Sequence, residues 1–412
     1  MRNNAKTNAE NTAALYNNIC RIILIMICAA MIAAVPAYWL FTDPPEFIGL
    51  EKRYRAGWPE FSGSQFLSGK WGERVESWMK DRIPARDFLV GVDSYIWYFS
   101  GRQAARDVFT DGAGGLFDEP AEYAAGDLMK RLDKIAVFTA SLNAAQAGEA
   151  SKDQPDVSCV VLIPPEPGYV ARLPRRLKNL YNDDAIADAV IAYAGAQATE
   201  KGAVMTYVDL RQKFLEKGTD AYYKTDHHWN GSGAYAAYTE LGGVLGYEPL
   251  PRDAFTIDTV GDFYGSVYAK SGLWLTGPDK IELWSPPYPL RVTVVNDSKE
   301  PEIRDTPFFN EYLTDWDMYS TFLGGINGLT IVDNPGYAAG DTLFVVKDSY
   351  ANSLIPLLAA NYNRIVAVDL RRYRGAAGDL LLEYGVSGEK NVFLFVYSMD
   401  HIANDPDLLW LR

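Results

Sequence analysis

Residues 342–352 read TLFVVKDSYAN, and this stretch decides how the chain folds. A short run of apolar residues ends here at a polar Lys-Asp-Ser turn. Such a run is typical of a strand that is buried on both faces. We expect a helix to begin near Ala351. The stretch therefore predicts a buried strand, a turn and a helix, with Ser349 at the carboxyl end of the strand.

Similar short apolar runs lie at 157–163, 203–208, 365–368 and 392–396. Residues 128–142 and 185–198 have the apolar spacing of helices. Buried strands that alternate with helices predict an α/β fold, here a three-layer sandwich with a mostly parallel sheet. Ligand sites in such sheets lie beyond the carboxyl ends of the strands. Ser349 is therefore expected at the edge of the sheet where a site forms.

The position of Ser349 suits a nucleophile. A serine at the end of a strand faces solvent, and the N–H groups of the following helix can stabilise an oxyanion. The alternative is structural, because Asp348 and Ser349 are both favoured helix caps. The pattern of residues alone leaves the two interpretations open.

A second candidate stretch, residues 224–230, reads KTDHHWN and holds two of the three histidines. In an extended segment, residues two apart point the same way. We therefore expect Asp226 and His228 to share a face and His227 to point away. A carboxylate beside an imidazole can fix its tautomer and stabilise the imidazolium, as in a catalytic triad. Two alternatives stay open: a turn with surface histidines, and a metal site built from Asp226, His227, His228 and His401.

The N-terminal part carries an uncharged apolar run at 22–41, long enough to cross a bilayer as a helix. Arg2, Lys6 and Arg21 precede the run, which favours a cytoplasmic N-terminus. A cleaved signal peptide is the alternative, with a weak cleavage signal at 35–37. The aromatic residues at 38–41 extend the run and favour an uncleaved anchor. Either way, we expect the remaining chain to be exported.

We predict four parts in the chain. A disordered cytoplasmic tail at 1–21 is followed by the transmembrane anchor at 22–41. A membrane-proximal helical segment follows at 43–119, since residues 50–107 are largely amphipathic. The catalytic domain is expected at 120–412.

Composition excludes some classes of function. The formal net charge of -14 argues against nonspecific nucleic-acid binding, which needs clustered Lys and Arg. Cys20 and Cys28 lie in or beside the apolar run, which leaves Cys159 as the single cysteine of the folded body. The body therefore has no internal disulfide and no metal site built on cysteine pairs. Cys159 is expected in the core.

The chain resembles the DHHW family, named for the tetrapeptide found here at 226–229. The resemblance extends over most of the chain after the anchor. It includes the blocks at 81–86, 263–266, 319–325, 347–352 and 369–371. That family is similar to the alginate O-acetyltransferases, which implies an SGNH-hydrolase-like fold. One departure is that Ile326 separates Gly325 from Asn327, where the family has Gly-Gly-Asn.

The resemblance implies a catalytic triad of Asp226, His228 and Ser349. Triads are recognised by geometry, so the order Asp, His, Ser does not weaken the assignment. The expected substrate or oxyanion contacts are Tyr350, Asn352, Arg371, Asn327 and Trp229. Structural alternatives stay open for three of these: capping for Asn352, a surface position for Arg371, and packing for Trp229, which we favour over sugar stacking.

The resemblance implies an O-acetyltransferase that acts on an extracytoplasmic or cell-surface polysaccharide through an acetyl-serine intermediate. It implies no cofactor and no metal. Because acetyl-CoA is cytosolic, it also implies a membrane-bound O-acyltransferase partner that delivers acetyl groups. Two rivals are a carbohydrate acetylesterase with the same triad and a non-catalytic scaffold of a polysaccharide synthesis complex.

Overall fold

The computed structural model describes residues 2–42, 45–102, 104–120, 122–146, 157–171, 173–296, 300–337, 341–385 and 391–412. Contacts within the chain divide it into two compact units, residues 1–93 and residues 94–412. The four-part division expected from the sequence stays a prediction.

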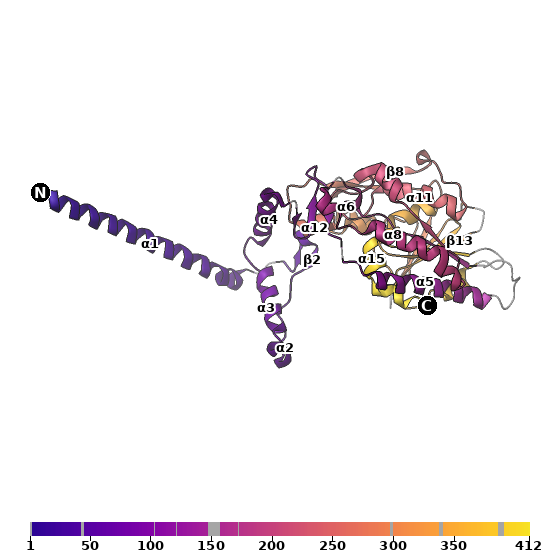
Figure 1. Ribbon diagram of the computed structural model, residues 1–412, viewed down its shortest axis with the longest axis horizontal. Coiled ribbons are helices and arrows are strands. Elements are labelled where there is room, and N and C mark those ends of the chain that lie inside the picture. Colours follow the sequence, from indigo (N-terminus) through magenta and orange to yellow (C-terminus); the bar gives the residue numbers. More distant parts are fainter. Residues whose placement is uncertain are drawn as a thin grey trace. The chain divides into compact units, whose positions relative to one another are not determined.

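The first unit opens with one long helix, α1 (Arg2–Phe41), drawn in indigo in Figure 1. Its segment Asn18–Trp39 has a mean hydropathy of 2.5 and is long and apolar enough to cross a membrane. The tail that we expected to be disordered is helical from Arg2 onward. The tail continues the helix of the apolar segment, and adding turns to an existing helix avoids the cost of nucleating a new one.

The rest of the first unit is small. It contains β1 (Phe47–Ile48), β2 (Arg53–Tyr54), α2 (Gly63–Leu67) and α3 (Lys70–Asp81), and α4 (Arg86–Trp97) contains the point of division. The buried carboxylate of Asp81 holds this unit together. It accepts two hydrogen bonds from the Arg53 guanidinium, at 2.8 and 2.6 Å, and one from the Ala56 N–H. The predicted helices between 50 and 107 are therefore present, with short strands beside them.

The second unit is built on an eight-stranded sheet in the order β11-β10-β12-β14-β13-β15-β6-β7. Five strands run parallel: β6 (Val157–Leu162), β7 (Met205–Val208), β13 (Thr342–Lys347), β14 (Arg364–Val368) and β15 (Asn391–Val396). These are the five strands predicted from the sequence. Three antiparallel strands extend one edge: β10 (Arg291–Val295), β11 (Glu302–Arg304) and β12 (Leu329–Asp333). The mostly parallel sheet is thus confirmed.

Helices pack on both faces of this sheet (Figure 1). Alternate residues of β13 point to opposite sides: Leu343 and Val345 join one buried cluster, and Phe344 and Val346 join the other. The first cluster receives side chains from α11 (Gly231–Leu245) and α13 (Ala351–Leu358). The second receives them from α5 (Ala125–Gln146), α8 (Asp183–Ala192) and α15 (Met399–Asn404). Burial on both faces explains why these strands are continuously apolar.

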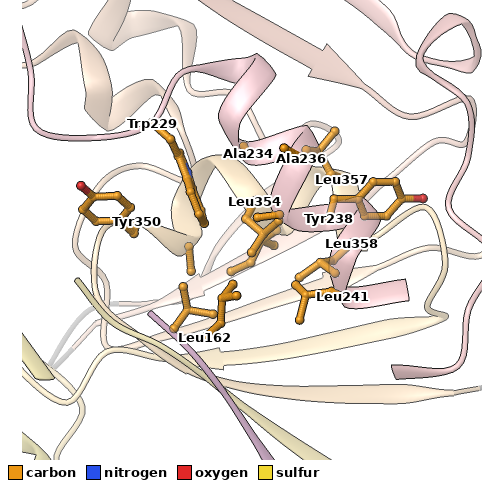
Figure 2. Packing of buried hydrophobic residues seen from close by; sticks show 14 of the residues in the cluster. Leu162, Trp229, Ala234, Ala236, Tyr238, Leu241, Tyr350, Leu354, Leu357 and Leu358 are labelled. Carbon is orange, nitrogen blue, oxygen red and sulfur yellow. The ribbon is translucent and has the colours of Figure 1, made fainter. Parts of the chain in front are cut away.

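Figure 2 shows part of the first cluster, with Leu354 above Leu162 of β6 and Leu241 to the right of Leu162. Trp229 lies between Tyr350 and the helix residues, so the polar stretch around it is anchored in the core.

The remaining elements of the second unit are short. They are β3 (Ala104–Ala105), β4 (Val108–Thr110), β5 (Leu116–Asp118), α6 (Pro167–Val170), α7 (Arg175–Lys178), α9 (Ala198–Glu200), α10 (Arg211–Lys217), β8 (Thr256–Phe263), α12 (Ser266–Ser271), β9 (Asp279–Ser285) and α14 (Asp379–Tyr384). The helix predicted at 185–198 is observed as α8 and α9 joined by a π-helical turn, Tyr193–Gln197.

Candidate active site

Ser349 lies in the turn between β13 and α13, as predicted. The turn is fixed by Asp348, whose buried carboxylate accepts hydrogen bonds from the N–H groups of Tyr350 (2.9 Å) and Ser398 (2.7 Å). The first cap position of α13 is Tyr350, and no side chain caps it. The structure therefore does not use Asp348 or Ser349 as the helix cap, and the Ser349 hydroxyl is left for another partner.

That partner is His228. The imidazole Nε2 lies 2.9 Å from the Ser349 Oγ, and the imidazole Nδ1 lies 2.5 Å from the Asp226 Oδ1. Asp226 therefore accepts a hydrogen bond from the Nδ1–H group of His228. This leaves Nε2 to accept a hydrogen bond from the Ser349 hydroxyl. The structure thus brings together the three residues that the resemblance pairs as a triad. Hydrogen bonds in this order are what a nucleophilic serine requires.

A glycine and a serine hold the Asp226 carboxylate from the other side. The N–H and the hydroxyl of Ser266 both donate to the Asp226 Oδ2, at 2.7 and 3.1 Å. The preceding Gly265 approaches so closely that a Cβ there would lie 2.2 Å from the Asp226 Cβ. Only glycine allows this approach, which is why the N-terminus of α12 can reach the carboxylate.

The electrostatics of the pair favour an ionised carboxylate and a neutral imidazole. Burial alone would raise the pKa of Asp226, but the two neighbouring imidazoles and the hydrogen bonds outweigh burial and hold the pKa well below its usual range. Burial, together with the neighbouring His227 ring, lowers the pKa of His228 to about 4, although Asp226 opposes the shift. His228 is therefore a neutral base at physiological pH.

Aromatic side chains pack around the His228 ring. Tyr319 stacks on it, and Tyr350 lies beside it with a centroid separation of 4.9 Å. Trp229 is fully buried, and its indole N–H donates to the Ser353 hydroxyl at 2.9 Å. This position fits the packing interpretation of Trp229 and leaves no exposed face for sugar stacking.

The expectation that His227 points away from His228 is wrong. The two imidazole rings lie side by side, with centroids 3.9 Å apart. The stretch around 226–228 is a series of bends and not an extended strand, so side chains do not alternate there. The His227 Nδ1 lies 2.7 Å from the Ser266 hydroxyl, and its backbone carbonyl accepts a hydrogen bond from the Tyr350 hydroxyl.

The two asparagines considered as oxyanion donors both hold one loop. Asn327 donates to the Leu323 carbonyl at 2.7 Å, and Asn352 donates to the Gly325 carbonyl at 3.1 Å. Leu323, Gly324 and Gly325 all have positive φ angles, so the loop needs support. Within the described part of the chain, the Ser349 backbone N–H has no acceptor and is the better candidate for an oxyanion donor.

Arg371 is committed to a neighbouring carboxylate. Its Nε and Nη2 bind the two oxygens of Asp369 at 2.8 and 2.6 Å. The buried Lys347 ammonium lies 3.6 Å from the same carboxylate. This bidentate pairing is typical of a structural ion pair, although the Arg371 side chain keeps some exposure.

The structure reduces the set of residues that could form the metal site considered from the sequence. Ligand atoms of Asp226, His227 and His228 lie within 4.8 Å of one another. His401 is not part of that group, because its Nδ1 lies 2.8 Å from the Asp348 Oδ2. A metal bound through either nitrogen of His228 would have to displace Asp226 or Ser349, so the donor set fits a hydrogen-bonded triad better than a metal centre.

Sequence reasoning assigned no role to Ser266, Tyr319, Ser353 or the Asp348–His401 pair. The blocks at 263–266 and 319–325 marked two of these residues without indicating what they contact. His401 follows β15 by only a few residues, and the carboxyl ends of parallel strands meet at one edge. The position of His401 just after a predicted parallel strand is the sequence signal that could have identified it as a site residue.

Comparison with known proteins supports the resemblance seen in the sequence. A family model described as "DHHW protein" matches residues 178–368, which contain Asp226, His228 and Ser349. The resemblance to the DHHW family is confirmed. A search of curated proteins finds no match.

Two solved structures share the fold. A DHHW family protein from Eubacterium siraeum is 18% identical with a TM-score of 0.57, over 74% of this chain and 94% of that chain. PatB1 of Bacillus cereus, solved with a sulfonyl adduct, is 17% identical with a TM-score of 0.59, over 74% of this chain and 98% of that chain. At these identities the likeness establishes the fold alone.

Proposed function

We propose that this DHHW-like chain is an O-acetyltransferase of the SGNH type that acetylates an extracytoplasmic or cell-surface polysaccharide through an acetyl-serine intermediate. One observation carries the proposal. The 2.9 Å contact from His228 Nε2 to Ser349 Oγ continues the 2.5 Å contact from Asp226 to the other side of the same ring. This is the arrangement that makes a serine hydroxyl nucleophilic.

In the first half of the reaction, His228 Nε2 takes the Ser349 proton as Oγ attacks the acetyl carbonyl. Asp226 stabilises the imidazolium that forms. The Ser349 backbone N–H, which has no acceptor in the described residues, would donate to the oxyanion. Collapse of the tetrahedral intermediate breaks the bond to the donor's oxygen, and His228 returns the proton to that leaving group. Ser349 is left acetylated.

In the second half, a sugar hydroxyl gives its proton to His228 and attacks the acetyl-serine carbonyl. The ester bond to Ser349 breaks, and Oγ recovers the proton. General-base assistance of this kind typically contributes about 10²–10⁴-fold. The sulfonyl adduct in PatB1 is in keeping with a fold that holds an activated nucleophile, because sulfonylating reagents attack such groups.

We place the body outside the cytoplasm, anchored by α1. Its segment Asn18–Trp39 is long and apolar enough to span a membrane, and Arg2 and Lys6 of the same helix lie before that segment. Since the acetyl donor of the cytosol cannot reach an exported site, we propose a membrane-bound O-acyltransferase as the partner that supplies acetyl groups.

The test is acetylation of Ser349. The detergent-solubilised full chain is incubated with an activated acetyl ester, and mass spectrometry measures the labelled fraction and its position. Ser349→Ala should abolish labelling, whereas Ser232→Ala, at a serine whose side chain makes no hydrogen bond to any described residue, should not. Labelling that persists in Ser349→Ala would remove Ser349 from the mechanism. Release of acetate without transfer to any polysaccharide would favour the acetylesterase.

A further inference from the structure

A cavity of about 490 Å³ is lined by residues next to the triad. His227, Tyr350, Ser398 and His401 are among its lining residues. Tyr350 follows Ser349 in the chain, and His401 binds Asp348, which precedes Ser349. The cavity therefore lies next to the segment that carries Ser349, a position suited to the second substrate.

Acidic side chains outnumber basic ones in the lining of this cavity. Four carboxyl groups, those of Asp118, Glu119, Glu166 and Asp400, contribute to the lining. Of the two basic side chains there, Lys270 lies 3.1 Å from Asp118, and the His401 Nδ1 lies 2.8 Å from Asp348. Each basic group of this lining thus has an acidic partner, so a carboxylate-bearing sugar would meet mainly acidic groups.

Of these four carboxyl groups, Glu166 has the least complete hydrogen bonding. Its Oε2 is buried and has no hydrogen-bond partner among the described residues. Burial, and then the nearby Asp183 carboxyl, raise the pKa of Glu166 well above its usual range. A buried acceptor without a donor is unfavourable, and a hydroxyl or ammonium group entering the cavity would supply one.

His401 offers the complementary group. Asp348 holds its Nδ1 in the protein, and the side chain is 33% exposed, so the remaining edge of the ring with Nε2 is presented to the cavity. Although burial lowers the pKa of His401, the hydrogen bond to Asp348 outweighs burial and raises it. With Nδ1 held by Asp348, Nε2 is the ring atom left to hydrogen-bond a sugar hydroxyl.

We infer that this cavity is the acceptor subsite, that Glu166 and His401 hold the acceptor there, and that the acceptor is a neutral or amino sugar and not a uronate. The inference rests on the proposed function. It gives the acceptor a chemical class, because a lining rich in carboxyl groups suits hydroxyl and ammonium groups and disfavours a carboxylate.

The test compares three acceptors of equal length: a neutral glucose oligosaccharide, its glucosamine counterpart and its glucuronate counterpart. The full chain is incubated in detergent with an activated acetyl ester and one of the sugars. The measurement is the amount of acetyl transferred to the sugar relative to the amount hydrolysed by water. Transfer to at least one of the first two should exceed transfer to the uronate by about tenfold or more, as expected for a like-charge contact. Equal or better transfer to the uronate would overturn the inference.

Variants then test the two residues. Glu166→Gln should raise the KM for the preferred acceptor by about tenfold, the usual effect of losing a hydrogen bond to a charged or buried group. The matched control is Glu248→Gln, at an exposed glutamate outside the cavity, which should leave KM unchanged. A KM that is equally unchanged in both variants would exclude Glu166 from the subsite.

Two substitutions by residues with amide side chains, His401→Asn and His401→Gln, test the role of His401. Asn can place its amide where Nδ1 binds Asp348, but it lacks the Nε2 edge, whereas Gln reaches the Nε2 position. If His401 binds the acceptor, His401→Asn should lose transfer relative to hydrolysis, and His401→Gln should recover part of it. The reverse order would mean that His401 only supports Asp348.

Binding to the Ser349→Ala protein separates the two proposals. Calorimetric titration of that variant with the three oligosaccharides needs no chemistry at the serine. A preference for the neutral or amino sugar would support the subsite even if Ser349 were never acetylated. A preference for the uronate would overturn the subsite even if acetyl-serine formed normally.

Discussion

The phenol ring of Tyr319 lies flat against the imidazole of His228, with ring centroids 3.9 Å apart and planes 11° from parallel. The Tyr319 hydroxyl also reaches the Ser349 carbonyl at 3.3 Å and the Ser353 hydroxyl at 3.2 Å. One side chain therefore contacts His228, Ser349 and the first turn of α13. The stacking holds the plane of the His228 ring.

We expect Tyr319→Leu to lower the rate of acetyl-enzyme formation by about 2- to 10-fold, the range that corresponds to losing one aromatic pair. Tyr319→Phe should lose less, because it keeps the stacked ring and gives up only the hydroxyl contacts. Burst kinetics with an activated ester measure both. A Phe variant as slow as the Leu variant would show that the hydroxyl contacts, and not the stacking, position His228.

Substitutions in 226–228 distinguish the triad from a metal site. Asp226→Asn should lower turnover by about 10⁴-fold and approach His228→Ala, because an amide can hold the imidazole in the wrong tautomer. His227→Ala should retain far more activity, since His227 contacts Ser266 and not Ser349. Turnover should also survive EDTA.

The effect of EDTA on turnover is measured with the same ester assay, and zinc is added back afterwards. A metal held by Asp226, His227 and His228 would make the two histidine substitutions similarly damaging. Loss of turnover with EDTA and its return with zinc would replace the triad with metal-assisted hydrolysis.

The pH dependence follows from the environment of His228. The base must be neutral to accept the Ser349 proton, and burial lowers the pKa of His228 to about 4. Acetyl-enzyme formation should therefore rise as pH increases through about 4 and be level from pH 5 to 8. Single-turnover rates across this range measure the midpoint. A midpoint near 6.5, the value of an ordinary histidine, would mean that His228 is solvated in the working enzyme.

The proposed topology predicts how intact cells respond to protease. If α1 anchors an exported body, external protease should digest residues after the helix and leave a short membrane-bound stub. In a cell with an outer membrane, spheroplasts are needed for access. A cytoplasmic marker protein controls for lysis. A body that is digested only after the inner membrane is permeabilised would place it in the cytoplasm.

Part of the fold follows from local pattern. The five parallel strands are buried on both faces, so their sequences are continuous apolar runs that stand out from the surroundings. The antiparallel strands β10, β11 and β12 escaped prediction. β10 alternates buried with more exposed residues and so lacks a continuous apolar run, and β11 is only 3 residues long, so neither stands out as the parallel strands do.

Local sequence pattern indicates the residue types of the site: a serine after a buried strand, and an aspartate and a histidine two positions apart. How these side chains meet depends on tertiary packing. His228 and Ser349 are 121 residues apart, and they come together because the 224–230 stretch is held by Trp229 in the core beside α13. Three other features likewise depend on long-range packing, which local periodicity does not encode. They are the side-by-side placement of His227 and His228, the support of Asp226 by Ser266, and the acidic cavity beside Ser349.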